Sequence, residues 1–331
     1  MSIFFLIDEY HDHYYDFVET KVKFPLTVVR PSRHYKRKQF AWIDGCYKVL
    51  KESSKKDIII FTLDIQAIIC SWICTLFFLN RKIVCINILL KDKKSFKNKI
   101  VSYLYKKALT RKNIIASVTS TEYGDWLNQK LGTNIEFILQ HDVFHDYYNK
   151  SSNSKSTKSI FCGGRNGRDW NFMLRVAKTL PDVTFNMVIS IGVKESLQET
   201  IPSNVIIHSN VNYDRFYQLM CESLMICLPL NTEAPAGLLV IFHAAANHKM
   251  VITTDNVVTR EYIGNDRGVV IDNDVQLWHN AIQYYLNNED IREQRASKLL
   301  CFLRENCSEK QYVEGIELMV NHLNVVNGLK S

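Results

Sequence analysis

Residues Asn231–Asp255 read NTEAPAGLLVIFHAAANHKMVITTD, and this stretch decides the fold class of the chain. An acid, Glu233, precedes Gly237, which opens an apolar run ending in the alanines at 244–246. The β-branched segment Met250–Thr254 then predicts a buried strand. A glycine at a helix start lets backbone N–H groups approach a ligand, and the helix N-terminus favours negative charge there. The pattern fits an ordinary strand–loop–helix–strand unit, or a site for a sugar joined to a diphosphate.

The rest of the C-terminal half alternates in the same way between apolar strands and amphipathic helices. Strands are predicted at 159–162, 184–189, 205–208, 224–228, 250–254 and 269–271, and helices at 170–179, 213–221, 238–246, 275–286, 291–307 and 308–323.

The N-terminal half shows the same alternation. Its predicted strands are 3–7, 26–29, 57–61, 83–90, 114–118 and 135–139, and its predicted helices are 41–51, 65–79, 95–110 and 122–131. The strands are continuously apolar rather than alternating, which predicts sheets that helices cover on both faces. The fold class is therefore α/β.

Residues 65–79 are almost uninterrupted apolar sequence, yet they predict a buried helix rather than a membrane span. They are shorter than the ~20 residues that a bilayer requires. They also lie between two predicted parallel strands, where a crossover helix is needed. No signal peptide is expected, since the apolar run at 3–7 is followed at once by Asp8 and Glu9.

One polar stretch, 149–159 (NKSSNSKSTKS), reads as a linker and divides the chain. The predicted domains are 1–150 and 158–307, followed by a C-terminal helix within 308–331. A length of 331 residues allows each domain its own core, and 47% hydrophobic residues argue against disorder. The nine cysteines include no Cys-x-x-Cys pair, so we expect reduced thiols in a cytosolic protein and no metal site.

The segment quoted above resembles the donor-site motif of GT-B glycosyltransferases of the retaining, family-4 type, also called glycosyl transferases group 1. Glu233 matches the first acid of that motif, Gly237 its glycine, 244–246 its small-residue helix and Val251–Ile252 its strand.

Two flanking segments carry the resemblance further. Ser159–Arg165 resembles the strand-Gly-Arg opening of the family's donor domain, and 259–263 with 268–271 resembles its "x-Arg-Glu-Ile … Gly-x-Leu-Val" region. The match covers roughly 158–275 in ordered pieces. Three features depart from the family. The Glu-to-Gly spacing is one residue longer, the second glutamate expected near Phe242 or His243 is absent, and Asn247–Met250 replaces Gly-x-Pro.

The resemblance implies two Rossmann-like domains that face each other across a cleft, with the acceptor in the N-terminal domain and the donor in the C-terminal one. It implies transfer of a hexose-like sugar, with retention, from a nucleotide-diphosphate sugar to a glycan. The expected acceptor is a lipid-linked saccharide of bacterial-type surface polysaccharide biosynthesis. No cofactor is expected, because the nucleotide sugar is itself a substrate. The terminal helix is expected to pack back toward the N-terminal domain.

The predicted phosphate site is the turn Gly163–Arg168, between a strand and a helix. Its backbone N–H groups form an anion nest, and guanidinium groups bind phosphate in a fork. Arg165 stands where the family has its arginine, and Arg168 substitutes for the family's lysine, whose position is Trp170. Gly164, Gly237 and Leu238 are assigned to donor binding. A solvated glycine-rich turn is the alternative.

Four further residues are candidate site residues. Glu233 matches the family acid that contacts the donor sugar near the reacting centre, and otherwise is a surface acid before a helix. His243 is assigned to the ribose in place of the missing acid, or is a core histidine. On the acceptor side, Asp64 and His11 follow predicted strands and are candidate catalytic residues, because strand ends in parallel sheets point at the ligand crevice.

The chain has a net charge of +7, and this charge is concentrated in one segment. Between Lys91 and Lys112 lie nine basic residues and one acid, so the local charge is +8 and the remainder sums to −1. The segment interleaves aromatic and aliphatic residues at near-helical spacing. It predicts either a helix that docks on anionic membrane or a solvated helix. Nucleic acid is not expected, since no recognition fold accompanies the charge. The expected location is cytoplasmic, peripheral on the inner face of the cell membrane.

Two alternatives to a glycosyltransferase stay open at this stage. One is a catalytically silent GT-B subunit that binds nucleotide sugar or glycan, which the missing second glutamate favours. The other is a GT-B-shaped epimerase or pyruvyl-type transferase with different cleft acids.

Overall fold

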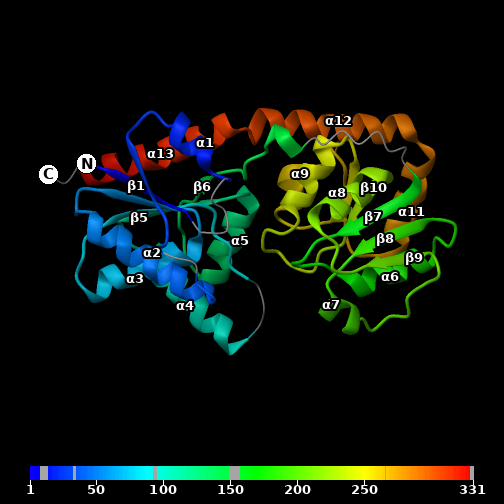
Figure 1. The fold of residues 1–331 in the computed structure, drawn as a ribbon, viewed down its shortest axis with the longest axis horizontal. Helices are drawn as coiled ribbons and strands as arrows, with labels where there is room; N and C mark the ends of the chain where they lie inside the picture. Colours follow the sequence, from blue (N-terminus) through cyan, green and yellow to red (C-terminus); the bar gives the residue numbers. More distant parts are fainter. Residues whose placement is uncertain (8–13, 33–34, 92–94, 149–156, 265, 329–331) are drawn as a thin grey trace. The chain divides into compact units, whose positions relative to one another are not determined.

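The computed structural model describes residues 1–7, 14–32, 35–91, 95–148, 157–264 and 266–328. It divides into two compact units (Figure 1). Unit 1 comprises Met1–Val143 and Ser308–Ser331, and unit 2 comprises Phe144–Cys307. Each unit holds one six-stranded sheet whose strand pairs are all parallel. The predicted α/β class is therefore confirmed.

The sheet of unit 1 has the strand order β2-β1-β3-β4-β5-β6. Its strands are β1 (Ile3–Leu6), β2 (Leu26–Val29), β3 (Ile58–Phe61), β4 (Lys82–Cys85), β5 (Ile114–Val118) and β6 (Ile138–Leu139). The buried residues of β1 and β3 are all apolar, as expected for a sheet covered on both faces.

Helices cover both faces of this sheet (Figure 1). One face carries α2 (Lys38–Glu52), α3 (Asp64–Leu76), α4 (Phe96–Leu109) and α5 (Thr121–Leu131), and the other carries α1 (Asp16–Lys21) and α13 (Glu309–Gly328). The buried side chains Tyr312, Ile316 and Met319 of α13 join the core formed by β1, β3 and β4. The C-terminal helix is thus part of unit 1.

The predicted strand 83–90 is wrong in length, because β4 ends at Cys85. Of the apolar residues that follow, Ile86, Ile88 and Leu90 are buried in a turn in which Asn87 has a φ of 47°, whereas Leu89 is exposed. The N–H groups of Ile86 and Ile88 donate to the carbonyls of Phe61 and Ser117, at 3.0 Å each. An apolar pattern cannot separate such a buried turn from a strand.

Unit 2 has the strand order β12-β11-β10-β7-β8-β9. Its strands are β7 (Thr157–Gly163), β8 (Thr184–Val188), β9 (Val205–His208), β10 (Ser223–Leu228), β11 (Met250–Thr254) and β12 (Val269–Ile271). Its helices are α6 (Trp170–Lys178), α7 (Ile191–Glu195), α8 (Tyr213–Glu222), α9 (Leu238–Ala246), α10 (Thr259–Ile263), α11 (Val275–Asn287) and α12 (Glu289–Asn306), with a 3-10 turn at Asp146–Tyr148.

Side chains alternate between the two faces of this sheet. Ile160 and Cys162 of β7 pack with Phe172 of α6 and Trp278 of α11. Phe161 points to the opposite face, where its ring contacts Phe216 of α8 at 5.0 Å. The short helices α1, α7 and α10 are absent from the prediction, because five or six residues carry no helical period.

The prediction of a crossover helix within 65–79 is confirmed, since α3 joins the parallel strands β3 and β4. The prediction that the whole stretch is a buried helix is wrong at its end, because α3 ends at Leu76 and Leu76–Phe78 are exposed. Among the residues that the structure describes, no helix is both long and apolar enough to cross a membrane.

Gly268, directly before β12, tests the packing of unit 2. A Cβ atom there would lie 2.6 Å from the carbonyl oxygen of Val251 and 2.8 Å from Cγ2 of Ile263. We expect Gly268→Ala to lower the free energy of unfolding by about 1–3 kcal/mol, because the backbone must shift. The control Gly192→Ala meets no atom within 4 Å and should leave stability unchanged or raise it by up to about 1 kcal/mol. Denaturant titration measures both, and equal effects would contradict the packing.

Candidate active site

The order of strands in unit 2 reverses between β7 and β10. The chain runs from β7 to β8 and β9 on one side, then returns to place β10 on the other side of β7. In open parallel sheets the ligand crevice lies outside the carboxyl ends of the strands at such a point. Two loops leave the sheet there: 164–169 after β7 and 229–237 after β10.

Backbone hydrogen bonds join these two loops. The N–H of Asp169 donates to the carbonyl of Pro229, and the N–H of Asn231 donates to that of Gly167, at 3.0 Å each. Arg168 and Leu230 form the bridge between them. The two loops therefore hold each other in a fixed position at the point where the strand order reverses.

The Arg168 side chain is buried within this pair of loops, with 7% of its surface exposed. Its Nε donates to the carbonyl of Gly163 at 3.1 Å, and its Nη1 to that of Asn166 at 2.7 Å. Burial lowers the pKa of Arg168 to about 10, so the group remains a cation at neutral pH. Across the described ranges no carboxylate forms an ion pair with it. A buried cation with only carbonyl partners is costly, and an anion would offset that cost.

Two glycines make room for this guanidinium. A Cβ on Gly164 would lie 2.4 Å from Nη2 of Arg168, and one on Gly237 would lie 3.3 Å from the same atom. Both residues have positive φ, 130° and 87°, which other residues rarely adopt. Gly237 is also the N-cap of α9 and provides no side-chain cap for its first N–H groups. Arg168 and the N-terminus of α9, which begins at the buried Leu238, thus meet in one anion-binding position.

Arg165 lies in the same turn but faces solvent. In the part of the chain that the structure describes it forms no hydrogen bond or ion pair. The two arginines of the predicted phosphate site therefore differ: Arg168 is held in place by the backbone, whereas Arg165 is able to move.

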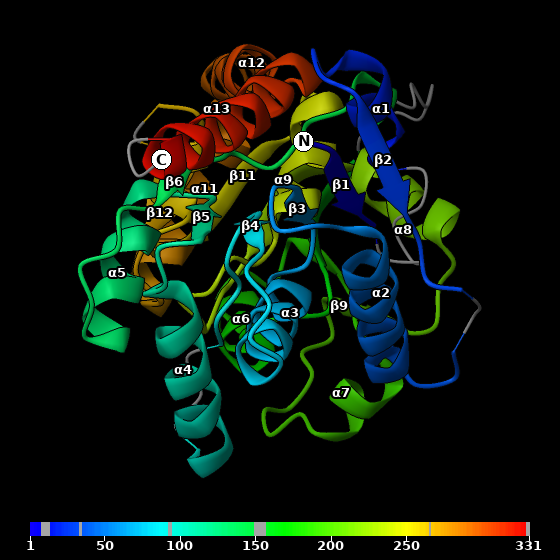
Figure 2. The same ribbon diagram turned by 90° about the vertical axis from the view of Figure 1, so that its left-hand side faces the viewer.

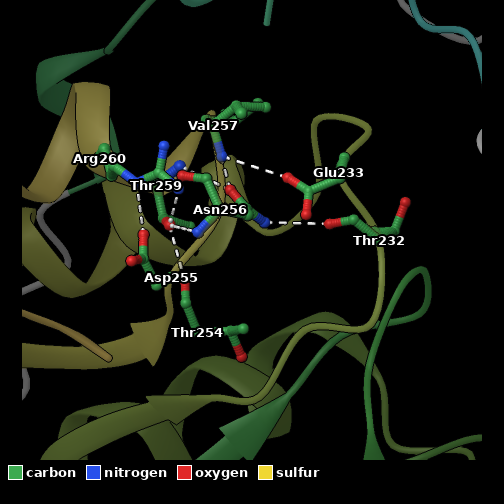
Figure 3. Close-up of polar contacts among 9 residues, drawn as sticks. Thr232, Glu233, Thr254, Asp255, Asn256, Val257, Thr259 and Arg260 are labelled. Atoms are coloured by element: carbon green, nitrogen blue, oxygen red, sulfur yellow. Dashed lines mark hydrogen bonds and ion pairs between the residues drawn. The ribbon is translucent and has the colours of Figure 1, made fainter. Parts of the chain in front are cut away.

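Glu233 lies in the loop after β10, and a second loop fixes its position (Figure 3). One of its carboxylate oxygens accepts the N–H of Val257 at 3.3 Å. The adjacent Asn256 is buried, and its amide donates to the carbonyl of Thr232 at 3.0 Å. The side-chain oxygen of Asn256 accepts the N–H groups of Val258 and Thr259, at 2.9 and 2.8 Å. Asn256 thus joins the Glu233 loop to the start of α10, a role that the sequence prediction missed.

His243 is buried in α9 and is surrounded by aromatic rings of unit 2. Its Nε2 lies 2.8 Å from the hydroxyl of Tyr213, the first residue of α8. Its ring centroid lies 4.3 Å from that of Tyr148 and 5.4 Å from that of Tyr217. The preceding Phe242 is fully buried, so an apolar ring occupies the helix position next to His243. Tyr213 was not predicted, because one tyrosine at a helix start carries no sequence signal.

Comparisons with known proteins agree with the fold. The family model described as Glycosyl transferases group 1 matches residues 191–298. A search of curated proteins finds no match to the sequence.

Several solved structures share the fold over nearly the whole chain. HepE of Anabaena, solved in complex with UDP and glucose, is 15% identical, with 97% of this chain and 99% of that chain covered and a TM-score of 0.69. Sucrose-phosphate synthase from Thermosynechococcus elongatus is 11% identical, with 99% and 100% covered and a TM-score of 0.76. The pneumococcal O-GlcNAc transferase GtfA, in complex with UDP and GlcNAc, is 13% identical, with 86% and 60% covered and a TM-score of 0.60.

The chain is a GT-B glycosyltransferase. The solved structures give the fold, and the family match within unit 2 gives the class of enzyme.

The acceptor-side candidates of this glycosyltransferase lie in unit 1. His11 is outside the described residues. Asp64 is the first residue of α3 and is buried. One of its oxygens accepts the N–H of Leu89 and the hydroxyl of Tyr105, at 2.8 Å each. These bonds give Asp64 a part in joining α3 to α4 and to the turn after β4, which the sequence does not indicate.

A polar pair that the sequence analysis missed lies at the carboxyl edge of the same sheet. Asn87, after β4, donates from its amide to Asp142, after β6, at 2.7 Å. Ser117 of β5 accepts the N–H of Asn87 at 2.8 Å. Within the described ranges no group of three His, Cys, Asp or Glu side chains could hold a metal ion. None of the nine cysteines, all of them in described positions, forms a disulfide.

Asp64→Asn separates a structural from a catalytic role. Burial raises the pKa of this carboxyl in the folded chain, so its ionisation opposes folding once the pH exceeds its unfolded pKa of 3.8. The amide removes that cost and keeps an acceptor for Leu89 and Tyr105. We expect a higher melting temperature than wild type at pH 7 and a smaller gain near pH 3, with sugar transfer retained. Loss of transfer with unchanged melting would place Asp64 in the reaction.

Proposed function

We propose that this glycosyltransferase takes a nucleoside-diphosphate sugar in unit 2 and moves the sugar to a glycan acceptor bound by unit 1. The observation that carries the proposal is the buried Arg168 guanidinium, which lies between Gly164 and Gly237 at the N-terminus of α9. A diphosphate matches this position in charge. It also supplies acceptors for the remaining guanidinium N–H and for the first N–H groups of the helix.

Sugar transfer breaks the bond between the anomeric carbon and an oxygen of the diphosphate, while an acceptor hydroxyl bonds to that carbon and loses its proton. Negative charge therefore grows on the departing diphosphate oxygen. Arg168 and the N–H groups at 238 and after it are already oriented before the reaction, so their stabilisation needs no rearrangement. Arg165 reaches the outer phosphate oxygens from the solvent side of the turn. The proposal includes no cofactor, because these groups supply the positive charge that the leaving group requires.

Glu233 acts on the donor sugar rather than on the nucleotide. Asn256 and Val257 hold its loop beside the start of α10. A carboxylate held in this way can accept sugar hydroxyls and stabilise positive charge at the anomeric carbon. The resemblance to the retaining family is the reason to expect retention of configuration.

The ribose contact is assigned to His243 together with Tyr213. In the family a glutamate near position 242 or 243 holds the ribose, and here Phe242 is apolar and fully buried. The Tyr213 hydroxyl is bonded to His243 and belongs to a side chain that is 54% exposed. This pair offers polar groups of the kind that the ribose hydroxyls require.

The acceptor is proposed to be a lipid-linked saccharide of bacterial-type surface polysaccharide synthesis, at the cytoplasmic face of a membrane. The basic segment 91–112 of unit 1 supports this proposal. Its helix α4 exposes Phe96, Ile100 and Tyr103 to solvent beside Lys97 and Lys99. Exposed apolar residues among lysines suit an anionic lipid surface. His11 and the Asn87–Asp142 pair are the candidate acceptor groups.

A second candidate function is a nucleotide-sugar-binding subunit without catalysis. Phe242 at the position of the missing acid favours it. The two candidates share the diphosphate site and differ only in whether Glu233 acts.

Arg168→Met tests the proposed donor site. We expect it to weaken nucleoside-diphosphate binding by about 1.5–3 kcal/mol, the value of hydrogen bonds to a charged group. Stability should change little, since the variant loses two bonds to carbonyls but also removes an unpaired buried charge. Arg165→Met should lose less affinity, because its cation is solvated.

Calorimetry with UDP measures the change in affinity, and thermal unfolding measures the change in stability. Arg175→Gln is the matched control, because Arg175 is an exposed arginine of α6 whose partner is Glu199. Unchanged affinity in Arg168→Met would remove the diphosphate from this position. Equal losses in Arg168→Met and Arg175→Gln would show a loss of general charge only.

The variant Glu233→Gln distinguishes a transferase from a binding subunit without catalysis. The amide keeps an oxygen for the N–H of Val257 but carries no charge, so transfer should fall by at least about tenfold, the equivalent of 1.4 kcal/mol in the barrier. Affinity for UDP should stay within a factor of about two. Turnover of a radiolabelled donor measures the rate of transfer, and calorimetry measures the affinity for UDP. Equal losses of both would assign Glu233 to the nucleotide, and unchanged turnover would remove it from the reaction.

A further inference from the structure

Three consecutive large apolar side chains project into solvent at the end of α3. Leu76 is 69% exposed, Phe77 70% and Phe78 96%. Single exposed apolar residues are common on protein surfaces, but a contiguous group is not. The group also lies at the amino edge of the sheet, away from the strand ends that form ligand crevices.

The backbone of Phe78 holds these side chains outward. Phe78 has a φ of 53°, and the N–H of Leu79 donates to the carbonyl of Cys74 at 2.7 Å. This is the closing bond of a Schellman C-cap, whose left-handed position is usually glycine. A phenylalanine is strained in this conformation, and backbone strain of this kind is a reason to look for a function.

The loops around this group are basic. The amino edge of β3, β4 and β5 carries the loops 53–57, 77–81 and 110–113. Arg81 donates to Ser53 from the second loop to the first, at 3.1 and 2.9 Å, and Asn113 donates to the carbonyl of Arg81 at 2.6 Å. Exposed lysines of these loops are Lys55, Lys56 and Lys112.

The one acid in these three loops is Asp57. It is buried and accepts hydrogen bonds from the N–H groups of Ser2 and Ser54, so it does not offset the positive charge of the lysines at the surface.

A cavity of about 560 Å³ opens beside Phe78. Arg111 and Lys112 line it together with Thr75 and Asn80. Arg111 is fixed there by Ser71, whose carbonyl and hydroxyl oxygens accept from it at 2.5 and 2.8 Å. The cavity thus places a positioned guanidinium and a lysine next to the exposed aromatic rings.

The neighbouring helix of the same layer also exposes apolar side chains. α3 and α4 pack side by side (Figure 2), and Trp72 of α3 donates to the carbonyl of Leu104 at 3.2 Å. α4 contributes the exposed Phe96, Ile100 and Tyr103.

We propose that the α3 corner, defined as Leu76–Phe78 with Lys55, Lys56, Arg111 and Lys112, inserts into an anionic lipid bilayer. The three apolar side chains enter the acyl region, the lysines meet headgroup phosphates, and the cavity receives one phosphate headgroup. The proposal deepens the membrane association within the proposed function, and it does not depend on donor binding or transfer.

A bilayer fits this corner better than a protein partner does. Lysines are depleted at protein–protein interfaces, whereas this apolar group has cations on three adjacent loops. An apolar interior beneath an anionic surface is the chemistry of a bilayer interface.

Environment-sensitive labelling at one position tests the insertion. Cys301 is the exposed cysteine, so Cys301→Ser provides the background for Phe78→Cys carrying a nitrobenzoxadiazole fluorophore. Leu277→Cys is the matched control, because Leu277 is an exposed apolar residue of α11 in unit 2. With vesicles of phosphatidylcholine and phosphatidylglycerol, we expect the emission at position 78 to rise and shift to the blue, and the control to stay constant.

Unlabelled variants separate the contributions of apolar and basic residues. Phe77→Ser/Phe78→Ser should lower vesicle partitioning by roughly tenfold or more, since each ring loses its apolar burial. Lys55→Gln/Lys56→Gln/Lys112→Gln should lower it on the mixed vesicles, and the remaining binding should depend less on salt. Both variants should keep the wild-type melting temperature, because the altered residues are exposed.

Three results would overturn the proposal. They are an unchanged emission at position 78 with vesicles, an equal change at position 277, and an emission rise with protein concentration alone, which would indicate a protein interface. None of these results involves the affinity for UDP. If they contradict membrane insertion of the α3 corner, the test of Arg168 is therefore unaffected.

Discussion

The proposed donor site depends on one buried charge. Arg168 sits at the point where the sheet of unit 2 reverses its strand order, and its guanidinium is bonded only to backbone carbonyls of its own turn. Burying a cation in this way opposes folding, as the lowered pKa of Arg168 shows. Two glycines of positive φ leave room for the guanidinium, and a backbone bridge between the loops holds it in place. A site that destabilises the unliganded protein binds its anion more strongly, because the ligand removes the penalty.

The remainder of the site follows from this constraint. The same bridge that holds Arg168 fixes the start of the loop that carries Glu233, and Asn256 fixes its other side. In the proposed function, diphosphate and sugar are bound by groups whose positions are linked through the backbone. The proposed ribose contact differs, since it involves the aromatic cluster around His243 rather than a carboxylate.

Sequence reasoning predicts much of this fold because the decisive features are local. The apolar strand 250–254 and the glycine-opened helix 238–246 appear in the structure with the expected bounds. Motif position ranks Arg165 above Arg168, whereas in the structure Arg168 is the buried one and lies against Gly164 and the distant Gly237. Likewise Asp64 follows a strand as a cleft residue should, yet Tyr105 and Leu89, far along the chain, take up its carboxylate. From the sequence, Leu76–Phe78 are expected to be the end of a buried helix. In the structure the helix ends in a C-cap in which Phe78 has a positive φ, and these three side chains face solvent.

The central claim is that the cation at Arg168 holds a diphosphate, and a crystal structure of the chain with UDP tests it most directly. We expect a β-phosphate within hydrogen-bonding distance, about 2.7–3.2 Å, of both the Arg168 guanidinium and an N–H of the first turn of α9. A nucleotide bound with its phosphates outside this distance from Arg168, or in unit 1, would contradict it.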